Sequence, residues 1–406
     1  MTNLLNFVFT KKNCYFFFLI ITLLVCFVSQ KIYEFDLDLN IQDGGYYKLI
    51  SEDLRNFFYV RSYYSSRILG PFLAWLMQKL FFIKAYYAFL ALVCIFFYLL
   101  QVITFNFLSN KTKVYWPTFS FVILIYFSNW VILYNFFNPY QLVDLLCYFF
   151  SLLLIISTLR KQLLYFFAFS FFAILNKHYM IILVFLCSVQ LFFNVEKKYR
   201  KEIIFFFFLV FALLTLIQKF SGAYSPSPSE TIFTLSFEWI LNKLLELRYF
   251  FTIIFNDLNI FYLLPFIFLI FVKDNINIIT KNHLIVSYFY IMTVMLVVMH
   301  LLFGAENFPR IFFQAFYVVV ILLSINFIKN NNSRFFNIVL FLSPTLILIE
   351  YAILLFNVKF TNSGFVNYMH FDRPFNFISF YYTGSALFLV LIFENKLFKK
   401  YGKNFK

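Results

Sequence analysis

Charged side chains are scarce in this chain, and their scarcity decides its broad class. Only 13% of the 406 residues are charged, whereas 63% are apolar and the mean hydropathy is +0.83. A soluble domain carries roughly a quarter charged residues and about half apolar ones. The apolar runs are continuous rather than alternating, which excludes a transmembrane β-barrel. The sequence therefore predicts an all-α, polytopic membrane protein that forms a single domain over residues 1–406.

Patterns of cysteine chemistry are absent as well. The chain has five cysteines, none of them in a C-x-x-C motif or in a polar loop, where a metal site or a disulfide would be expected. All five lie within or at the edge of apolar stretches: Cys14, Cys26, Cys94, Cys147 and Cys187. We expect them to act as small apolar side chains in helices.

Apolar runs between charged breaks predict a transmembrane helical bundle of about twelve spans. A spanning helix needs about 20 apolar residues. No small-x-small cleavage site follows the first run, so we expect that run to be retained as a helix. The predicted spans are 14–30, 85–108, 115–135, 141–158, 163–175, 179–193, 202–219, 255–272, 284–302, 311–328, 335–356 and 378–394.

The charge asymmetry of the connecting segments predicts the topology. With the N-terminus inside, the inner segments carry 19 basic and 4 acidic residues, so the whole net charge of +15 lies on one side. By the positive-inside rule that side is cytoplasmic, and both termini lie there. The basic balance is thus a topology signal and predicts no nucleic-acid partner. The inner connections 109–114 and 160–162 are short basic hinges without a recognisable motif.

Three longer segments are predicted on the outer side, and polar residues gather in them. They cover residues 31–84, 220–254 and 357–377. The apolar stretch 68–83 is too short to span before Lys84, so we expect an interfacial helix there. A second interfacial helix is expected over 231–248. These two helices belong to the first and the fourth outer loop.

The first outer loop contains the most acidic run of the chain. Asp36 and Asp38 have a D-x-D spacing that can chelate a divalent ion such as Mg²⁺ or Mn²⁺, and the alternative is a solvated charged run. Asp43 precedes Gly44-Gly45, a pair that permits a tight turn. Asp43 is a candidate catalytic carboxylate, and the alternative is an N-cap of the helix that follows.

Further candidates lie at the outer ends of the predicted spans. Asp144 opens the fourth span, and Lys177 separates the fifth from the sixth. Glu306 and Arg310 join the ninth span to the tenth, where they are either functional or paired with each other on one helix. Glu350 lies inside the eleventh predicted span, where a carboxylate is costly and functional by default. The alternatives are a protonated packing partner or a span that ends elsewhere.

Two short motifs carry a resemblance to a known family. They are Asp43-Gly-Gly-Tyr-Tyr47 and Tyr64-Ser-Ser-Arg67-Ile-Leu-Gly-Pro71-Phe-Leu-Ala74. With the many spans and the long first outer loop, they resemble the GT-C superfamily of membrane glycosyltransferases, in particular uncharacterised bacterial members. The chain lacks the W-W-D-Y-G motif of oligosaccharyltransferases and the Asp-Glu pair of lipid A aminoarabinose transferases, so the resemblance leaves the acceptor open.

The resemblance implies an activity and roles for the candidate residues. The donor would be a sugar linked to polyprenyl phosphate, and the acceptor a glycan or lipid of the cell envelope outside a bacterial inner membrane. Asp43 would act as general base. Arg67, Lys177 and Arg310 would bind the phosphate, with Asp144 and Glu306 completing the site. A divalent metal is an optional cofactor, because these cations could stabilise the leaving phosphate themselves.

Besides a non-catalytic membrane scaffold, two other functions remain open from the sequence. A lipid-linked sugar flippase or another twelve-span transporter would place charges near mid-membrane and show internal symmetry. Glu350 is the one convincing buried charge, and no repeat stands out. An O-antigen-polymerase-like enzyme would share the outer arginine and acidic residues.

Overall fold

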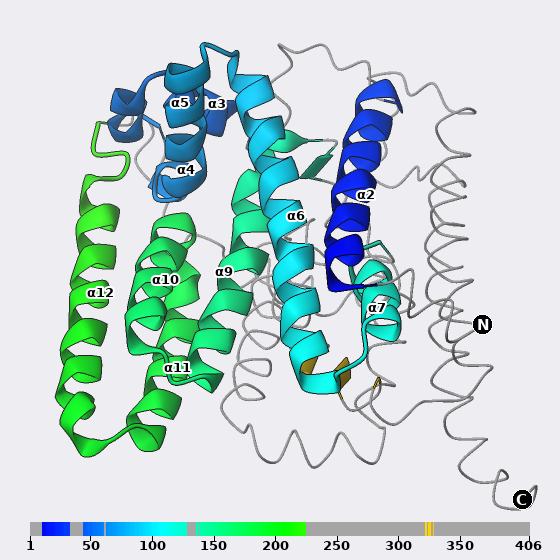
Figure 1. The fold of residues 1–406 in the computed structure, drawn as a ribbon. Helices are drawn as coiled ribbons and strands as arrows, with labels where there is room; N and C mark the ends of the chain where they lie inside the picture. Colours follow the sequence, from blue (N-terminus) through cyan, green and yellow to red (C-terminus); the bar gives the residue numbers. More distant parts are fainter. Residues whose placement is uncertain are drawn as a thin grey trace, which may run out of the picture.

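The computed structural model describes residues 10–32, 44–60, 62–127, 135–136, 138–224, 321–322, 324–325 and 328. Within these ranges the chain is helical and contains no strand, as the sequence predicts (Figure 1). The long helices are α2 (Lys11–Ile32), α6 (Ala85–Thr112), α7 (Trp116–Phe127), α9 (Leu142–Leu159), α10 (Leu163–Asn176), α11 (Ile181–Asn194) and α12 (Arg200–Phe220). The short ones are α3 (Gly44–Glu52), η1 (Leu54–Phe58), α4 (Ser62–Ser65), α5 (Leu69–Phe81), η2 (Pro139–Gln141), η3 (His178–Met180) and η4 (Lys197–Tyr199).

Polar side chains join α2 to α6 at three levels. Gln30 Oε1 accepts a hydrogen bond from Tyr86 (2.7 Å), and Thr22 Oγ1 accepts one from Gln101 (2.9 Å). At the third level, the Tyr15 hydroxyl donates to Asn106. Residue numbers rise along α2 while they fall along α6, so the two helices are antiparallel. Buried polar contacts of this kind hold apolar helices together where burial alone gives no preference for a partner.

The four helices from α9 to α12 form successive antiparallel hairpins. Connections of three to five residues join them, and such short links place consecutive helices side by side. Pairs two positions apart, α9 with α11 and α10 with α12, are in contact as well. Figure 1 shows these helices as one group beside the long α6.

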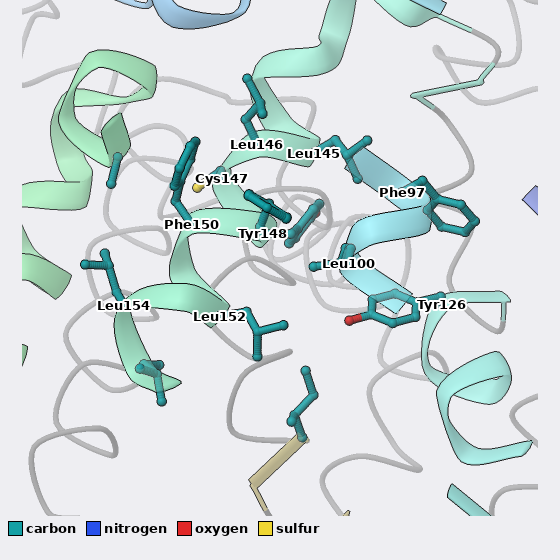
Figure 2. Packing of buried hydrophobic residues seen from close by; sticks show 14 of the residues in the cluster. Phe97, Leu100, Tyr126, Leu145, Leu146, Cys147, Tyr148, Phe150, Leu152 and Leu154 are labelled. Atoms are coloured by element: carbon teal, nitrogen blue, oxygen red, sulfur yellow. The ribbon is translucent and has the colours of Figure 1, made fainter. Parts of the chain in front are cut away.

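The core forms where α6 lies between α9 and α7. Figure 2 shows Leu145 and Tyr148 of α9 on the side of α6 where Leu100 lies. Phe97 points to the other side, and its ring meets that of Tyr126 of α7 edge to face, with centroids 6.1 Å apart. All five side chains are fully buried. The Tyr126 hydroxyl is hydrogen-bonded to that of Thr104 on α6 (2.5 Å), so this large polar ring is satisfied inside the core.

The segment from α3 to α5 lies at one end of the bundle (Figure 1), which we call the cap end. Here α5 contacts α3, α6, α9 and α10. The end of α12 is tied to the same region, because the amides of Gly222 and Tyr224 donate to the carbonyls of Phe57 (3.1 Å) and Phe58 (2.8 Å). The opposite end, which carries the α6–α7 and α9–α10 turns, is called the hinge end.

Lengths and composition of the described helices fit a membrane protein. Three helical stretches are long and apolar enough to cross a bilayer: Ala85–Thr112, Pro139–Leu159 and Lys197–Phe220. Two shorter apolar stretches, Leu163–Asn176 and His178–Asn194, coincide with the predicted fifth and sixth spans. A helix also covers the predicted interfacial stretch 68–83, as α5. The total of twelve spans stays a prediction, because the segments after 224 lie almost wholly outside the described residues.

Two glycines let the cap end approach α9 closely. A Cβ added to Gly44, the first residue of α3, would lie 2.9 Å from Cβ of Tyr140 and 3.4 Å from Oδ1 of Asn138. A Cβ at Gly70, in the first turn of α5, would lie 3.2 Å from Cγ2 of Val143. Both glycines thus place a helix start against the residues that open α9.

Replacing these glycines by alanine should have graded effects on stability. Gly44→Ala should lower the free energy of unfolding by about 1–3 kcal/mol, because Cβ of Tyr140 is fixed to its backbone and cannot yield. Gly70→Ala should cost less, because the Val143 methyl group can shift by a few tenths of an ångström. Thermal unfolding of the purified variants in detergent measures the difference. Equal melting temperatures for both variants and the wild type would contradict this close approach.

Candidate functional site

A buried ion pair joins Asp144 to Lys177, two candidate residues that lie at the ends of predicted spans. Lys177 Nζ donates a hydrogen bond to Oδ1 of Asp144, and both side chains are only 3% exposed. The same ammonium also donates to the hydroxyl of Tyr179 (3.1 Å). Two residues far apart in the sequence, which were selected by their positions at span ends, are therefore direct partners.

Helix geometry explains why each charge is stable at its place. Asp144 lies in the first turn of α9, where the helix dipole and free amides favour an anion. Lys177 follows the last residue of α10, where the dipole favours a cation. The neighbouring Asn176 donates to the carbonyl of Val143 (2.8 Å), which fastens the end of α10 to the start of α9.

Arg67 is the second buried cation of the cap end. It lies in the turn between α4 and α5 with 6% of its surface exposed, and its Nη1 donates to the hydroxyl of Tyr47 (2.8 Å) on α3. Tyr47 is fully buried and meets Tyr64 edge to face, with ring centroids 6.2 Å apart. The two sequence motifs that carry the family resemblance are thereby joined through one hydrogen bond.

His178 lies close enough to Arg67 and Lys177 for both charges to affect its pKa. It lies in η3, the turn between α10 and α11. Burial, followed by the charge of Arg67 and then that of Lys177, lowers the pKa of His178 to about 4. The imidazole is therefore neutral at neutral pH. Two cations, one carboxylate and this imidazole make up the cluster of Arg67, Asp144, Lys177 and His178.

Three helix starts meet around the cluster and add to its positive potential. Gly44 at the start of α3 lies against Tyr140, and Gly70 in the first turn of α5 lies against Val143 at the start of α9. Each helix start presents amide hydrogens and the positive end of its dipole. Because the cations and these helix ends share one region, the arrangement favours binding of an anion.

Two buried amide groups beside the ion pair have spare hydrogen-bonding capacity. Within the part of the chain that the structure describes, Oδ1 of Asn176 and Nε2 of Gln141 have no hydrogen-bond partner. Both side chains are at most 2% exposed. A polar ligand would satisfy them, since a buried amide atom without a partner is costly.

The other candidate residues lie outside the described residues. They are the catalytic candidate Asp43, the metal candidates Asp36 and Asp38, the outer pair Glu306 and Arg310, and the intramembrane Glu350. Among the described residues, no group of three or more His, Cys, Asp and Glu side chains could hold a metal ion.

Three participants of the site were not selected from the sequence. Tyr47 occurs in the sequence only as part of a motif, and neither Tyr179 nor His178 belongs to a recognisable pattern. The signal for Tyr47 was its place after Asp43-Gly-Gly, but no pattern in one sequence pairs it with Arg67. Tyr179 follows Lys177 by two residues, and only the extended backbone at Lys177 lets the two side chains meet.

Comparison with known proteins identified no relative of this chain. No family description matches the sequence, and neither a curated protein nor a solved structure is significantly similar.

The buried ion pair can be tested through its effect on stability. Asp144→Asn should lower the free energy of unfolding by about 3–5 kcal/mol, because it leaves the buried Lys177 ammonium uncompensated. Lys177→Met should have a similar effect. The double variant should lose clearly less free energy of unfolding than the two single variants together, since neither charge is left buried without its partner. Denaturant unfolding of the four proteins in detergent gives this double-mutant cycle.

The exposed pair Asp53–Arg55 provides the matched control. Its side chains are 40% and 84% exposed, and Arg55 Nη2 lies 2.6 Å from Asp53 Oδ2. Asp53→Asn and Arg55→Gln should change stability little, because solvent screens such a pair. Additive losses for Asp144→Asn and Lys177→Met would show that the two charges do not interact.

Proposed function

We propose that the protein is a membrane glycosyltransferase that moves a sugar from a polyprenyl-phosphate donor to a cell-envelope acceptor. The transfer takes place on the extracytoplasmic side of a bacterial inner membrane, with both chain termini in the cytoplasm. The observation that carries this proposal is the buried cluster of Arg67, Asp144 and Lys177 at one end of a bundle of apolar helices.

The position of the cluster suits a phosphate at the end of a lipid. Apolar helices reach the site from one side, and α5 presents exposed apolar residues such as Phe72, Leu76 and Leu80 beside it. A polyprenyl chain can lie along such surfaces while its phosphate meets Arg67 and Lys177. Arginine and lysine bind phosphate through charge-assisted hydrogen bonds, which are about twice as strong as neutral ones.

Asp144 has a positioning role in this proposal. Its carboxylate holds the Lys177 ammonium at the cap end, where a donor phosphate would meet it. The Nε2 group of Gln141 can donate to a phosphate or sugar oxygen, and Oδ1 of Asn176 can accept from a sugar hydroxyl.

Asp43 is proposed as the general base. It is the residue directly before Gly44, which contacts Tyr140 and Asn138 at the start of α9. The carboxylate takes the proton of an acceptor hydroxyl as that oxygen attacks the anomeric carbon of the sugar. The bond between this carbon and the phosphate oxygen breaks, and polyprenyl phosphate leaves with the additional negative charge. A single displacement of this kind inverts the configuration at the anomeric carbon.

Positive charge at the leaving group supplies the catalysis in this scheme. Charge develops on the phosphate as the bond breaks, and preorganised cations stabilise it most in a site that excludes water. Glu306 and Arg310 belong to the proposed site on the basis of the family resemblance. A divalent metal, with Asp36 and Asp38 as candidate ligands, stays an optional part of the proposal.

A flippase is the alternative class, and the described charges argue for the enzyme. Charged residues that serve a transported substrate are expected near mid-membrane. Asp144 and Lys177 lie instead at the helix ends of α9 and α10, and Arg67 lies in a turn. This arrangement fits chemistry at a membrane surface better than passage through the bundle.

Release of polyprenyl phosphate by the purified protein tests this function. A panel of polyprenyl-phosphate sugars is incubated with cell-envelope acceptors, and wild type is compared with Asp43→Asn and Arg67→Met. Asp43→Asn should reduce release by a factor of about 10²–10⁴, the usual contribution of a general base. Arg67→Met should reduce it by about 10²-fold or more, through lost stabilisation of the leaving phosphate.

Arg55→Gln is the matched control for Arg67→Met. It removes a cation from the same end of the bundle, but Arg55 is exposed and paired with Asp53. Release should stay close to the wild-type rate. If release is unaffected by Asp43→Asn, another carboxylate must act as the general base. Release unaffected by Arg67→Met, with the protein folded, would contradict the proposed phosphate site.

A further inference from the structure

A cavity of about 360 Å³ lies at the hinge end of the bundle, opposite the cluster of Arg67 and Lys177. Three helices line it, each with one face. The lining residues are Ile103, Asn106 and Phe107 of α6, Leu153, Ile156, Ser157 and Arg160 at the end of α9, and Gln162, Tyr165 and Phe169 at the start of α10. Its volume is in the range of small-molecule and lipid sites.

The lining changes from apolar to polar in the same direction on α9 and α10. Along α9 it runs from Leu153 and Ile156 to Ser157 and Arg160, and along α10 it runs in reverse from Phe169 to Tyr165 and Gln162. The turn between α9 and α10 marks the mouth of the cavity, and Arg160, Gln162 and Tyr165 are exposed there. Leu153 lies about 10 Å deeper than Arg160 along the helix, at 1.5 Å per residue.

Basic side chains gather at the mouth among the residues that the structure describes. Arg160 is followed by Lys161, and α6 ends nearby with Lys111 and Lys113. Neither turn, 109–114 or 160–162, contains an acidic residue. The first turn of α10 adds amide hydrogens beside Gln162 and Tyr165, which suits a negatively charged oxygen.

We propose that this cavity binds an anionic glycerophospholipid. One acyl chain occupies the apolar depth between α6, α9 and α10, and the phosphodiester lies at the mouth against Arg160. The hydroxyl of Tyr165 and the amide of Gln162 donate further hydrogen bonds to the headgroup. A free phosphate could bind at the mouth, but it would leave the apolar part of the cavity empty. A lipid without a phosphate could fill the apolar part, but it would offer Arg160 no anion.

The site is separate from the proposed donor site. The two lie at opposite ends of α9, since Asp144 is in its first turn and Arg160 directly follows its last residue. The inference depends on the cavity and its charge alone, and it holds whether or not the protein transfers a sugar.

Native mass spectrometry of the full-length protein in detergent tests the proposal. Phosphatidylglycerol and diacylglycerol with identical acyl chains are titrated separately, because diacylglycerol lacks the phosphodiester. The wild type should prefer phosphatidylglycerol by about tenfold, and Arg160→Gln should abolish this preference, because one charge-assisted hydrogen bond corresponds to about that factor. Arg160 is exposed, so the variant should fold normally, and its melting temperature verifies this.

Two further variants locate the bound lipid. Lys197→Gln removes an exposed cation of the α11–α12 connection that does not line the cavity, and the preference should persist. Leu153→Phe shortens the apolar depth, so it should weaken binding of both lipids by a similar factor.

Three results would overturn the inference. One is equal binding of the two lipids by the wild type. Another is a preference that survives Arg160→Gln but is lost in Arg67→Met, which would place the lipid at the cap end. The third is displacement of phosphatidylglycerol by millimolar inorganic phosphate, which would indicate a site for a free anion.

Discussion

The ion pair between Lys177 and Asp144 determines how the cap end is built. Moving two charges out of water is expensive, and the pair is tolerated because each charge lies at the helix end whose dipole favours it. It also fixes the end of α10 beside the start of α9, together with the hydrogen bond from Asn176 to Val143. The cap segment from α3 to α5 is then placed against this junction through the close approach of Gly44 and Gly70.

Charge is distributed unequally along the bundle, and both proposals follow from this. At the cap end, Arg67 and Lys177 are buried beside Asp144 and are surrounded by three helix starts. At the hinge end, Arg160 and the nearby lysines are exposed around an amphipathic cavity. Buried cations suit a reacting phosphate from which water is excluded. Exposed cations above an apolar depth suit a resident lipid headgroup.

Hydropathy predicted the helices because burial in lipid depends on composition and length. The predicted spans 85–108, 141–158, 163–175 and 202–219 agree with α6, α9, α10 and α12 to within a few residues. Positions at span ends also identified Asp144 and Lys177 as candidates, but their pairing depends on the extended backbone at Lys177. The hydrogen bond from Arg67 to Tyr47 could not be predicted from the sequence, because it depends on how α3 and α5 pack against each other. The cavity at the hinge end could not be predicted from the sequence. Segment 160–162 has no recognisable motif, and the cavity is formed by three helices that lie apart in the sequence.

A structure determined by cryo-electron microscopy with polyprenyl phosphate bound tests the central claim most directly. The account predicts density for the phosphate at the cap end, within hydrogen-bonding distance of Arg67 and Lys177, with the polyprenyl chain leaving along the apolar surface of the bundle. Phosphate density elsewhere on the protein, with both side chains still in the contacts they make with Tyr47 and Asp144, would contradict the account.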